Sequence, residues 1–168
     1  MVSLDDDVEE LDMLKAGKLS RIRDVDAFFR KAFQELQRSG LYLWGIYPVR
    51  NPFYMYPGHT TDLRFIIGVV HGYIVRHDRA LKMSIQAESK EDYERTLQHF
   101  LQDGGVLRFN NVAANTKFNA PGGLGTDRVQ RNLTAAVYLT KRYPEFVERK
   151  DRPNGMPEVK LVKPSRRV

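Results

Sequence analysis

The sequence contains no cysteine. Disulfides, zinc–thiolate sites, iron–sulfur clusters and thiol nucleophiles are therefore excluded. No apolar run approaches the roughly 20 residues that a membrane helix needs, so we expect no membrane span. The first residues, MVSLDDDVEE, are acidic and lack the basic and then apolar order of a signal peptide. These absences favour a cytoplasmic or otherwise intracellular protein.

The length of 168 residues and the hydrophobic content of 42% suit one compact domain with a real core. The net charge of +6 favours polyanionic partners such as nucleic acid or phosphate-bearing ligands. The charge is unevenly distributed, with acids gathered in the first dozen residues and basic residues near the end, at Lys160, Lys163, Arg166 and Arg167. We expect a single α/β domain over residues 1–162 and a basic tail over 163–168.

Three segments have the three-and-four spacing of apolar residues that is typical of amphipathic helices. The first runs from Asp24, a plausible N-cap, to Arg38, with Gly40 beyond its end. The second begins at Ser89 with a sequence similar to a capping box. The third begins at Thr126 or Asp127 and ends near residue 143. A shorter helix is expected from Val8 to Ala16, stopped by Gly17.

Strand-like runs alternate with these helices. They are rich in aromatic and branched residues and cover 2–4, 41–47, 63–75, 106–112 and 158–162. Residues 51–59 read as a loop, and Gly68 and Gly72 mark a bend or a close approach within the buried run 63–75. The alternation predicts the α/β class.

Asp5, Asp6 and Asp7 follow the first strand directly. Hard cations such as Mg²⁺ or Mn²⁺ prefer oxygen ligands and complete their shell with water or phosphate oxygens. Two carboxylates in this turn would therefore suit a metal that bridges to a diphosphate. A solvated acidic terminus explains the same residues without a ligand.

Glu91 and Asp92 lie at the start of the second long helix. The amide dipoles of a helix start keep a carboxylate ionised, and an ionised carboxylate can act as a general base on a hydroxyl group. Simple helix capping is the competing interpretation.

The segment NTKFNAPGGLG, residues 115–125, opens the third helix. Its backbone amides at Gly122 and Gly123 suit a phosphate, and Lys117 and Arg128 add positive charge. It is neither a Walker loop nor a GxGxxG motif, and a plain flexible turn fits it equally well. The histidines form no HExxH-like pair, which disfavours a zinc site; His71 and Trp44 are expected in the core.

The order of these signals resembles the C-terminal part of GT-A fold glycosyltransferases. The segment VSLDDDVEEL is similar to a strand that ends in a DxD element, and SKEDYERTLQHFLQDGGVLRFNNV is similar to the acidic helix, glycine turn and strand that follow in that fold. The resemblance is nearest to the TET-associated glycosyltransferases of phages and large viruses, which act in DNA modification. In that group a KGG-like loop comes next, where this chain has PGGLG.

The resemblance implies a partial GT-A-like mixed sheet with flanking helices and a metal-dependent transfer of sugar from a nucleotide sugar to an acceptor hydroxyl, on modified DNA among other acceptors. Asp5 and Asp7 would bind Mn²⁺ or Mg²⁺ and the donor diphosphate. Glu91 or Asp92 would be the base. The loop with Lys117, Gly122, Gly123 and Arg128 would lie near the donor phosphates.

In that fold a nucleotide-binding βαβ half precedes the DxD element, whereas only four residues precede Asp5. The resemblance therefore implies a truncated portion of an enzyme, or a partner chain that supplies the missing half.

Two other classes fit the sequence. A non-enzymatic nucleic-acid-binding protein would use the basic residues 160–167 and exposed aromatics such as Tyr54 and Tyr56. A structural or virion-type protein would pack the aromatic loop from Asn51 to Tyr56 against a partner. A nuclease is less well supported, because the acidic clusters lack the usual carboxylate-x-lysine spacing.

Overall fold

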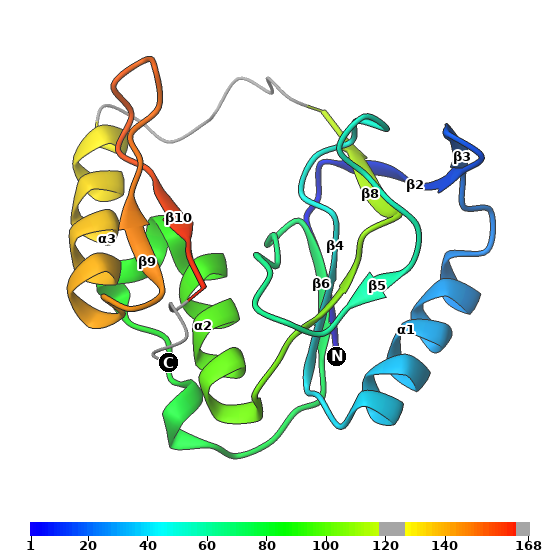
Figure 1. Cartoon of the computed structure of the whole chain (residues 1–168), viewed down its shortest axis with the longest axis horizontal. Helices are drawn as coiled ribbons and strands as arrows, with labels where there is room; N and C mark the ends of the chain where they lie inside the picture. Colours follow the sequence, from blue (N-terminus) through cyan, green and yellow to red (C-terminus); the bar gives the residue numbers. More distant parts are fainter. Residues whose placement is uncertain (118–126, 164–168) are drawn as a thin grey trace.

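The computed structural model describes residues 1–117 and 127–163, which form a mixed α/β structure (Figure 1). Its helices are α1 (Val25–Ser39), α2 (Glu91–Asp103) and α3 (Arg128–Arg142), with two short 3₁₀ turns, η1 (Arg79–Leu81) and η2 (Ile85–Lys90). The main mixed sheet has the order β1 (Val2–Leu4), β6 (Val70–Tyr73), β4 (Leu43–Ile46), β7 (Leu107–Phe109), β5 (His59–Thr60). A second sheet contains β3 (Lys18–Arg21), β2 (Val8–Lys15) and β8 (Val112–Thr116), and a hairpin contains β9 (Val147–Arg149) and β10 (Val159–Leu161).

Three strands of the main sheet run in the same direction. β6 is antiparallel to both β1 and β4, and β7 is parallel to β4. Leu4 pairs with Val70, and Ile46 pairs with Phe109. The carboxyl ends of β1, β4 and β7 therefore lie at one edge of the sheet, which we call the carboxyl edge. Ligands of open α/β sheets bind at such an edge.

The two faces of the main sheet are covered by different helices, with α1 on one side and α2 on the other (Figure 1). Trp44 is fully buried on the α1 side, where its ring contacts those of Phe28, Phe29, Phe33 and Phe109. Leu43, its neighbour along β4, belongs to a separate buried cluster with Ile66 and Val106. This alternation follows from the two-residue period of a strand.

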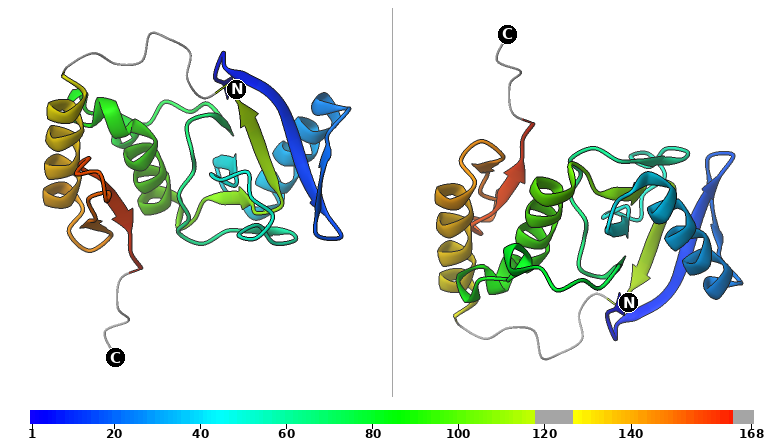
Figure 2. Two further views of the ribbon diagram at one scale, coloured as in Figure 1. Left: turned by 90° about the horizontal axis from the view of Figure 1, so that it is seen from above. Right: turned by 90° about the horizontal axis from the view of Figure 1, so that it is seen from below.

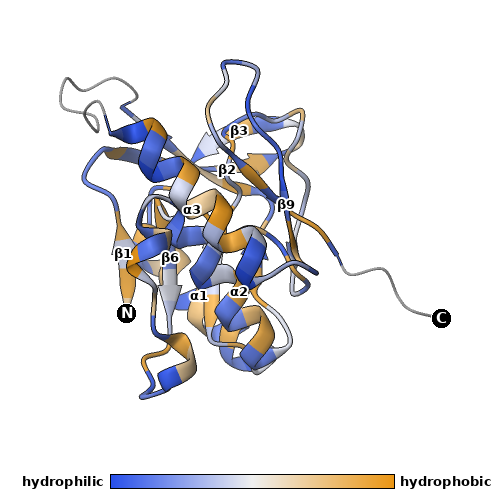
Figure 3. Ribbon diagram, turned by 90° about the vertical axis from the view of Figure 1, so that its left-hand side faces the viewer, coloured by the Kyte–Doolittle hydropathy of each residue, from blue (hydrophilic) through white to orange (hydrophobic). Residues whose placement is uncertain are grey.

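A second hydrophobic core lies away from the sheet, where α2, α3 and the β9–β10 hairpin pack together (Figure 2). Leu97 of α2 and Leu139 of α3 are completely buried there, together with Val147 and Val159 of the hairpin. Hydrophobic and hydrophilic positions alternate along α3, as expected for an amphipathic helix (Figure 3).

The prediction of α1 is confirmed. Asp24 accepts a hydrogen bond from the Ala27 amide at 2.8 Å, and Gly40 ends the helix with a φ of 66°. The expectation that Trp44 and His71 are core residues is confirmed as well, since both are buried. Gly104 ends α2 in the left-handed conformation.

The helix expected from Val8 to Ala16 is wrong. These residues form β2, which pairs with β3 through a turn in which Ala16 and Gly17 both have positive φ, 47° and 77°. Leu11 is buried in the main core. A bulge between Val8 and Glu10 resets the alternation of the strand, so that its apolar residues have a helix-like spacing in the sequence.

Other boundaries differ from expectation. Of the run 63–75 only Val70–Tyr73 is a strand, because the preceding backbone lies along α2, where the Ile66 amide donates to Thr96 Oγ1. The predicted capping by Ser89 is wrong: Lys90 holds the N-cap position, and Ser89 Oγ is buried without a hydrogen-bond partner in the described structure. The run 106–112 divides between β7 and β8, and β9 was not predicted. Asp127 holds the N-cap position of α3, but its side chain accepts no capping hydrogen bond from the described residues.

Across residues 1–117 and 127–163, we find no helix that is both long enough and apolar enough to cross a membrane.

Candidate functional site

The carboxyl edge brings the acidic triplet Asp5–Asp7 next to the segment that precedes β6. β1 ends at Leu4, and the Asp5 amide donates to the Val69 carbonyl at 3.0 Å. On the other side of this segment, Gly68 lies against Asp92 of α2. Residues 67–69 therefore lie between the end of β1 and the start of α2.

Asp5 and Glu91 are close enough for their charges to interact. Partial burial raises the pKa of the Asp5 carboxyl above its ordinary value, and the negative charges of Asp7, Asp6 and Glu91 raise it further. The Arg95 guanidinium acts in the opposite direction. The structure thus brings together two carboxylates that are 86 residues apart in the sequence.

Asp7 has an unusual environment for a carboxylate. Its Oδ1 is buried and receives no hydrogen bond from any residue in the described ranges. Its carbonyl accepts a hydrogen bond from the Lys117 amide at 3.0 Å, and Lys117 Nζ lies 3.2 Å from Glu9 Oε1. A buried carboxylate oxygen without a donor is costly unless a cation or water binds it.

Asp92 is pinned at the start of α2. Its Oδ1 accepts a hydrogen bond from the Tyr93 amide at 3.0 Å. Burial raises the pKa of the Asp92 carboxyl to about 6, and the amides of Tyr93 and Gly68 and the charges of Arg95 and Lys90 oppose this change. A carboxylate with such a pKa is a better proton acceptor at neutral pH than an ordinary aspartate.

Glu91 is more exposed and is paired with Arg95, at 2.7 Å between Oε1 and Nη2. His71 lies near enough to this pair for the charges to interact, and its Nδ1 is 2.9 Å from the Gly68 carbonyl oxygen. Burial lowers the pKa of His71 to about 4, with a further contribution from the charge of Arg95. His71 is therefore neutral near pH 7. Arg95 and His71 were not predicted as neighbours of the candidate site, and the helical spacing of Arg95 from Glu91 is the signal that points to Arg95.

A cavity of about 380 Å³ opens beside the triplet. Its walls come from the loop after β4, the segment before β6 and strand β8, with the lining residues Ile46, Tyr47, Pro48, Val49, Arg50, Ile67, Val69, Ala114, Asn115 and Thr116. Val69 bonds to Asp5, and Thr116 pairs with Val8. Arg50 forms an ion pair with the buried carboxylate of Asp12. The sequence contained no signal for this pair, since neither residue belongs to a motif.

Beyond this cavity the loop after β4 exposes large aromatic side chains. Phe53 is 85% exposed and Tyr54 is 56% exposed, and their rings contact each other edge to face. Tyr56 packs against Tyr47, and the guanidinium of Arg108 lies 4.9 Å from the centre of the Tyr47 ring. The base of the loop is therefore held in place while its tip is open to solvent.

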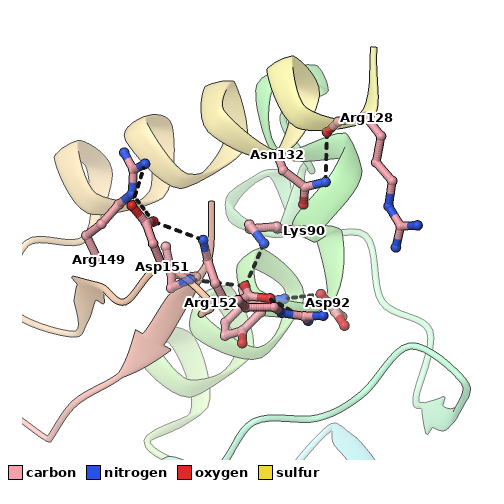
Figure 4. A network of polar contacts seen from close by, with 10 residues as sticks. Lys90, Asp92, Arg128, Asn132, Arg149, Asp151 and Arg152 are labelled. Atoms are coloured by element: carbon pink, nitrogen blue, oxygen red, sulfur yellow. Dashed lines mark hydrogen bonds and ion pairs between the residues drawn. The ribbon is translucent and has the colours of Figure 1, made fainter. Parts of the chain in front are cut away.

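The remaining predicted site residues are less well placed. Gly122 and Gly123 lie outside the described residues. Arg128 is the first residue of α3 and is exposed; its carbonyl accepts a hydrogen bond from Asn132 (Figure 4). Within the described part of the chain, no group of three or more His, Asp or Glu side chains is arranged to hold a metal ion. Asp5 and Asp7 thus offer at most a two-carboxylate site.

Comparison of the chain with protein-family models, with curated proteins and with solved structures gives no match.

Proposed function

We propose that this chain is a metal-dependent glycosyltransferase, or a portion of one, that uses a nucleotide sugar as donor and a hydroxyl group as acceptor. The observation that carries the proposal is that Asp5, at the end of β1, and Glu91, at the start of α2, lie within range for their charges to interact. The resemblance to GT-A fold enzymes implies that a DxD element and an acidic helix start lie at one site. Their shared position at the carboxyl edge supports it.

Asp5 and Asp7 would bind Mn²⁺ or Mg²⁺, and the buried Oδ1 of Asp7, which has no donor in the described structure, fits this role. The cation would supply charge neutralisation for the leaving diphosphate. Lys117, whose amide is bonded to Asp7, would add positive charge beside the phosphates.

Asp92 is the better candidate for the base. Its pKa of about 6, raised by burial, lies closer to neutral pH than that of an ordinary aspartate. It would accept the proton of the acceptor hydroxyl while that oxygen bonds to the anomeric carbon, and the bond to the diphosphate would break with its electron pair. Glu91, paired with Arg95, would orient the acceptor. A single base of this kind favours inversion at the anomeric carbon.

The outer edge of β1 could pair with a further strand. In the described structure β1 pairs only with β6, and its other edge is unpaired. A nucleotide-binding βαβ unit, on a partner chain or on another part of the same protein, would extend the main sheet there.

Binding of Mn²⁺ tests the proposal directly. In the NMR spectrum of the chain we expect Mn²⁺ to broaden resonances of residues 5–7 and 67–69 first, and a nucleoside diphosphate sugar to strengthen this binding. Asp5→Asn and Asp7→Asn are expected to abolish the selective broadening, whereas Asp6→Asn, the matched control, retains most of it. Uniform weak broadening, without effect of either substitution or of any nucleotide sugar, would contradict the proposal.

A second candidate function is nucleic-acid binding without catalysis. The exposed rings of Phe53 and Tyr54 favour it, because exposed aromatics stack on unpaired bases. Of the basic residues 160–167, Lys160 is paired with Glu148 and Lys163 with Asp62, while Arg166 and Arg167 lie outside the described residues. Salt-dependent DNA binding that is lost in Phe53→Ala and retained in an Asp5→Asn, Asp7→Asn double variant would favour this candidate over sugar transfer. A stable oligomer without affinity for DNA or nucleotides would instead favour the structural class.

A further inference from the structure

We propose that the β9–β10 hairpin positions the carboxylates at the start of α2, and that the ion pair between Lys90 and Glu158 makes this connection. Lys90 and Glu158 are then positioning residues for Asp92. The inference rests on the proposed function for the role of Asp92, but the connection itself can be measured without any activity.

Lys90 is a buried cation at the residue where α2 begins. It holds the N-cap position of α2, where its side chain makes no capping hydrogen bond in the described structure. The residue is only 4% exposed, and its Nζ donates to Glu158 Oε1 at 2.6 Å. Breaking a buried pair leaves one charge without compensation, which costs far more than losing a surface pair. The pair therefore fixes where α2 begins relative to the hairpin.

Glu158 is itself held in place from the hairpin side. Its Oε2 accepts a hydrogen bond from Arg152 Nη2 at 2.7 Å, and its Oε1 also accepts one from the Val159 amide at 3.0 Å. The Lys150 amide donates to the Glu158 carbonyl at 2.9 Å, which closes the two arms of the hairpin. Lys90 and Arg152 therefore both donate to this carboxylate, and Figure 4 shows these two side chains together with Asp92. These contacts and the charge of Lys90 keep the carboxyl ionised, and the pKa of Glu158 is lowered despite the opposing effect of burial.

Asp92 is connected to this ion pair through its sequence neighbours Lys90 and Tyr93. Asp92 lies two residues after Lys90, and the ring of Tyr93 stacks on that of Phe65 with 4.2 Å between the ring centres. Burial raises the pKa of the Tyr93 hydroxyl, and the negative charges of Glu158 and Asp92 raise it further. The groups that face Asp92 are Lys90 at the N-cap, Tyr93 and Arg95 of α2, and the Gly68 amide from the segment before β6. Of the two cations, Lys90 is the one that the hairpin compensates.

The test compares two substitutions that break the same pair from opposite sides. Glu158→Gln leaves the charge of Lys90 uncompensated, so the Asp92 titration midpoint is expected to fall by at least about 0.5 pH unit. Lys90→Met removes that positive charge, so the midpoint is expected to rise by a similar amount. ¹³C NMR of the side-chain carboxyls in the whole chain measures both midpoints.

Glu148→Gln is the matched control. Glu148 lies on the same hairpin and pairs with Lys160 at 2.7 Å, but both side chains are about half exposed. We expect this substitution to leave the Asp92 midpoint unchanged, because a solvated pair contributes little. If the pair were not connected to Asp92, Glu158→Gln and Lys90→Met would destabilise the protein alike and would move the Asp92 midpoint in one direction or not at all. That result would overturn the inference, whereas absence of nucleotide-sugar binding would affect only the proposed function.

Discussion

The indole of Trp44 lies directly over the α-carbon of Gly72, its register partner on β6. A Cβ added at Gly72 would lie 2.6 Å from Cε2 of the indole, closer than non-bonded carbon atoms approach. Because Trp44 is completely buried among the aromatic rings of α1 and β7, it has no room to move away. Gly72 is thus required by a close approach and not by backbone conformation.

Replacing this glycine is therefore expected to be costly. We expect Gly72→Ala to lower the free energy of unfolding by about 1–3 kcal/mol, the usual effect of overpacking a core. Gly68→Ala is the control, since a Cβ there would meet its nearest neighbour, Asp92 Cβ, at 3.8 Å. Urea unfolding of both variants measures the difference. Equal stabilities would show that the core around Trp44 can adapt.

Asp92 should make the protein less stable as the pH rises. Its folded pKa, raised by burial to about 6, exceeds its ordinary value of 3.8. The folded state therefore holds the proton more tightly than the unfolded state, and stability is lost between about pH 4 and pH 6. Asp92→Asn is expected to raise the free energy of unfolding by up to about 3 kcal/mol above pH 6 and to have no such effect below pH 4. Urea unfolding at pH 3.5 and 7 checks this, and a gain at both pH values would contradict it.

His71 should make the protein more stable as the pH rises. Burial lowers its folded pKa to about 4, from an ordinary value of 6.5. The stability that it contributes is fully present above pH 6.5 and is lost as the pH falls towards 4, because the unfolded state binds the proton more tightly. His71→Gln is expected to flatten the stability profile between these pH values by up to about 3 kcal/mol. His77, which is exposed, offers the matched control substitution, and urea unfolding across this pH range measures both variants.

The turn between β2 and β3 can be improved. Ala16 has a φ of 47°. This left-handed conformation costs any residue that has a Cβ about 1 kcal/mol or more. Asparagine tolerates this conformation and, followed by Gly17, gives the Asn-Gly pair that such hairpin turns favour. We expect Ala16→Asn to raise the melting temperature by a few degrees. Ala16→Val, which is branched at Cβ, should lower it; the reverse order would show that the turn is not formed in solution.

This turn also shows why part of the fold could not be predicted. α1 was predictable because its signals are local: Asp24, Gly40 and the apolar stripe lie within one segment. The strand character of Val8–Lys15 depends on β8, more than 90 residues later in the chain. Without knowledge of that partner, the spacing of Val8, Leu11 and Leu14 resembles a helix, and Ala16–Gly17 resembles a helix end.

The candidate site divides in the same way. That the acidic triplet and the start of α2 belong to one site is implied by the resemblance to GT-A fold enzymes, and it stays a prediction. Arg95, His71 and the pair of Arg50 with Asp12 were not predicted there, because they become neighbours only after the strands assemble. The distinction between Glu91 and Asp92 also needed the structure, since it depends on the backbone at Gly68 and on burial.

The open edge of β1 bears on how the protein behaves at high concentration. Ser3 pairs with His71 and the Asp5 amide bonds to Val69, so the main-chain groups of Val2 and Leu4 point outward. Such an edge can recruit identical edges and start fibrils. Here the strand is three residues long and runs straight into three carboxylates, whose mutual repulsion would oppose stacking. Acidification or a divalent cation would weaken that repulsion. Aggregation along this edge should therefore be fastest at low pH or with a divalent cation present, where the negative charges of the triplet are neutralised.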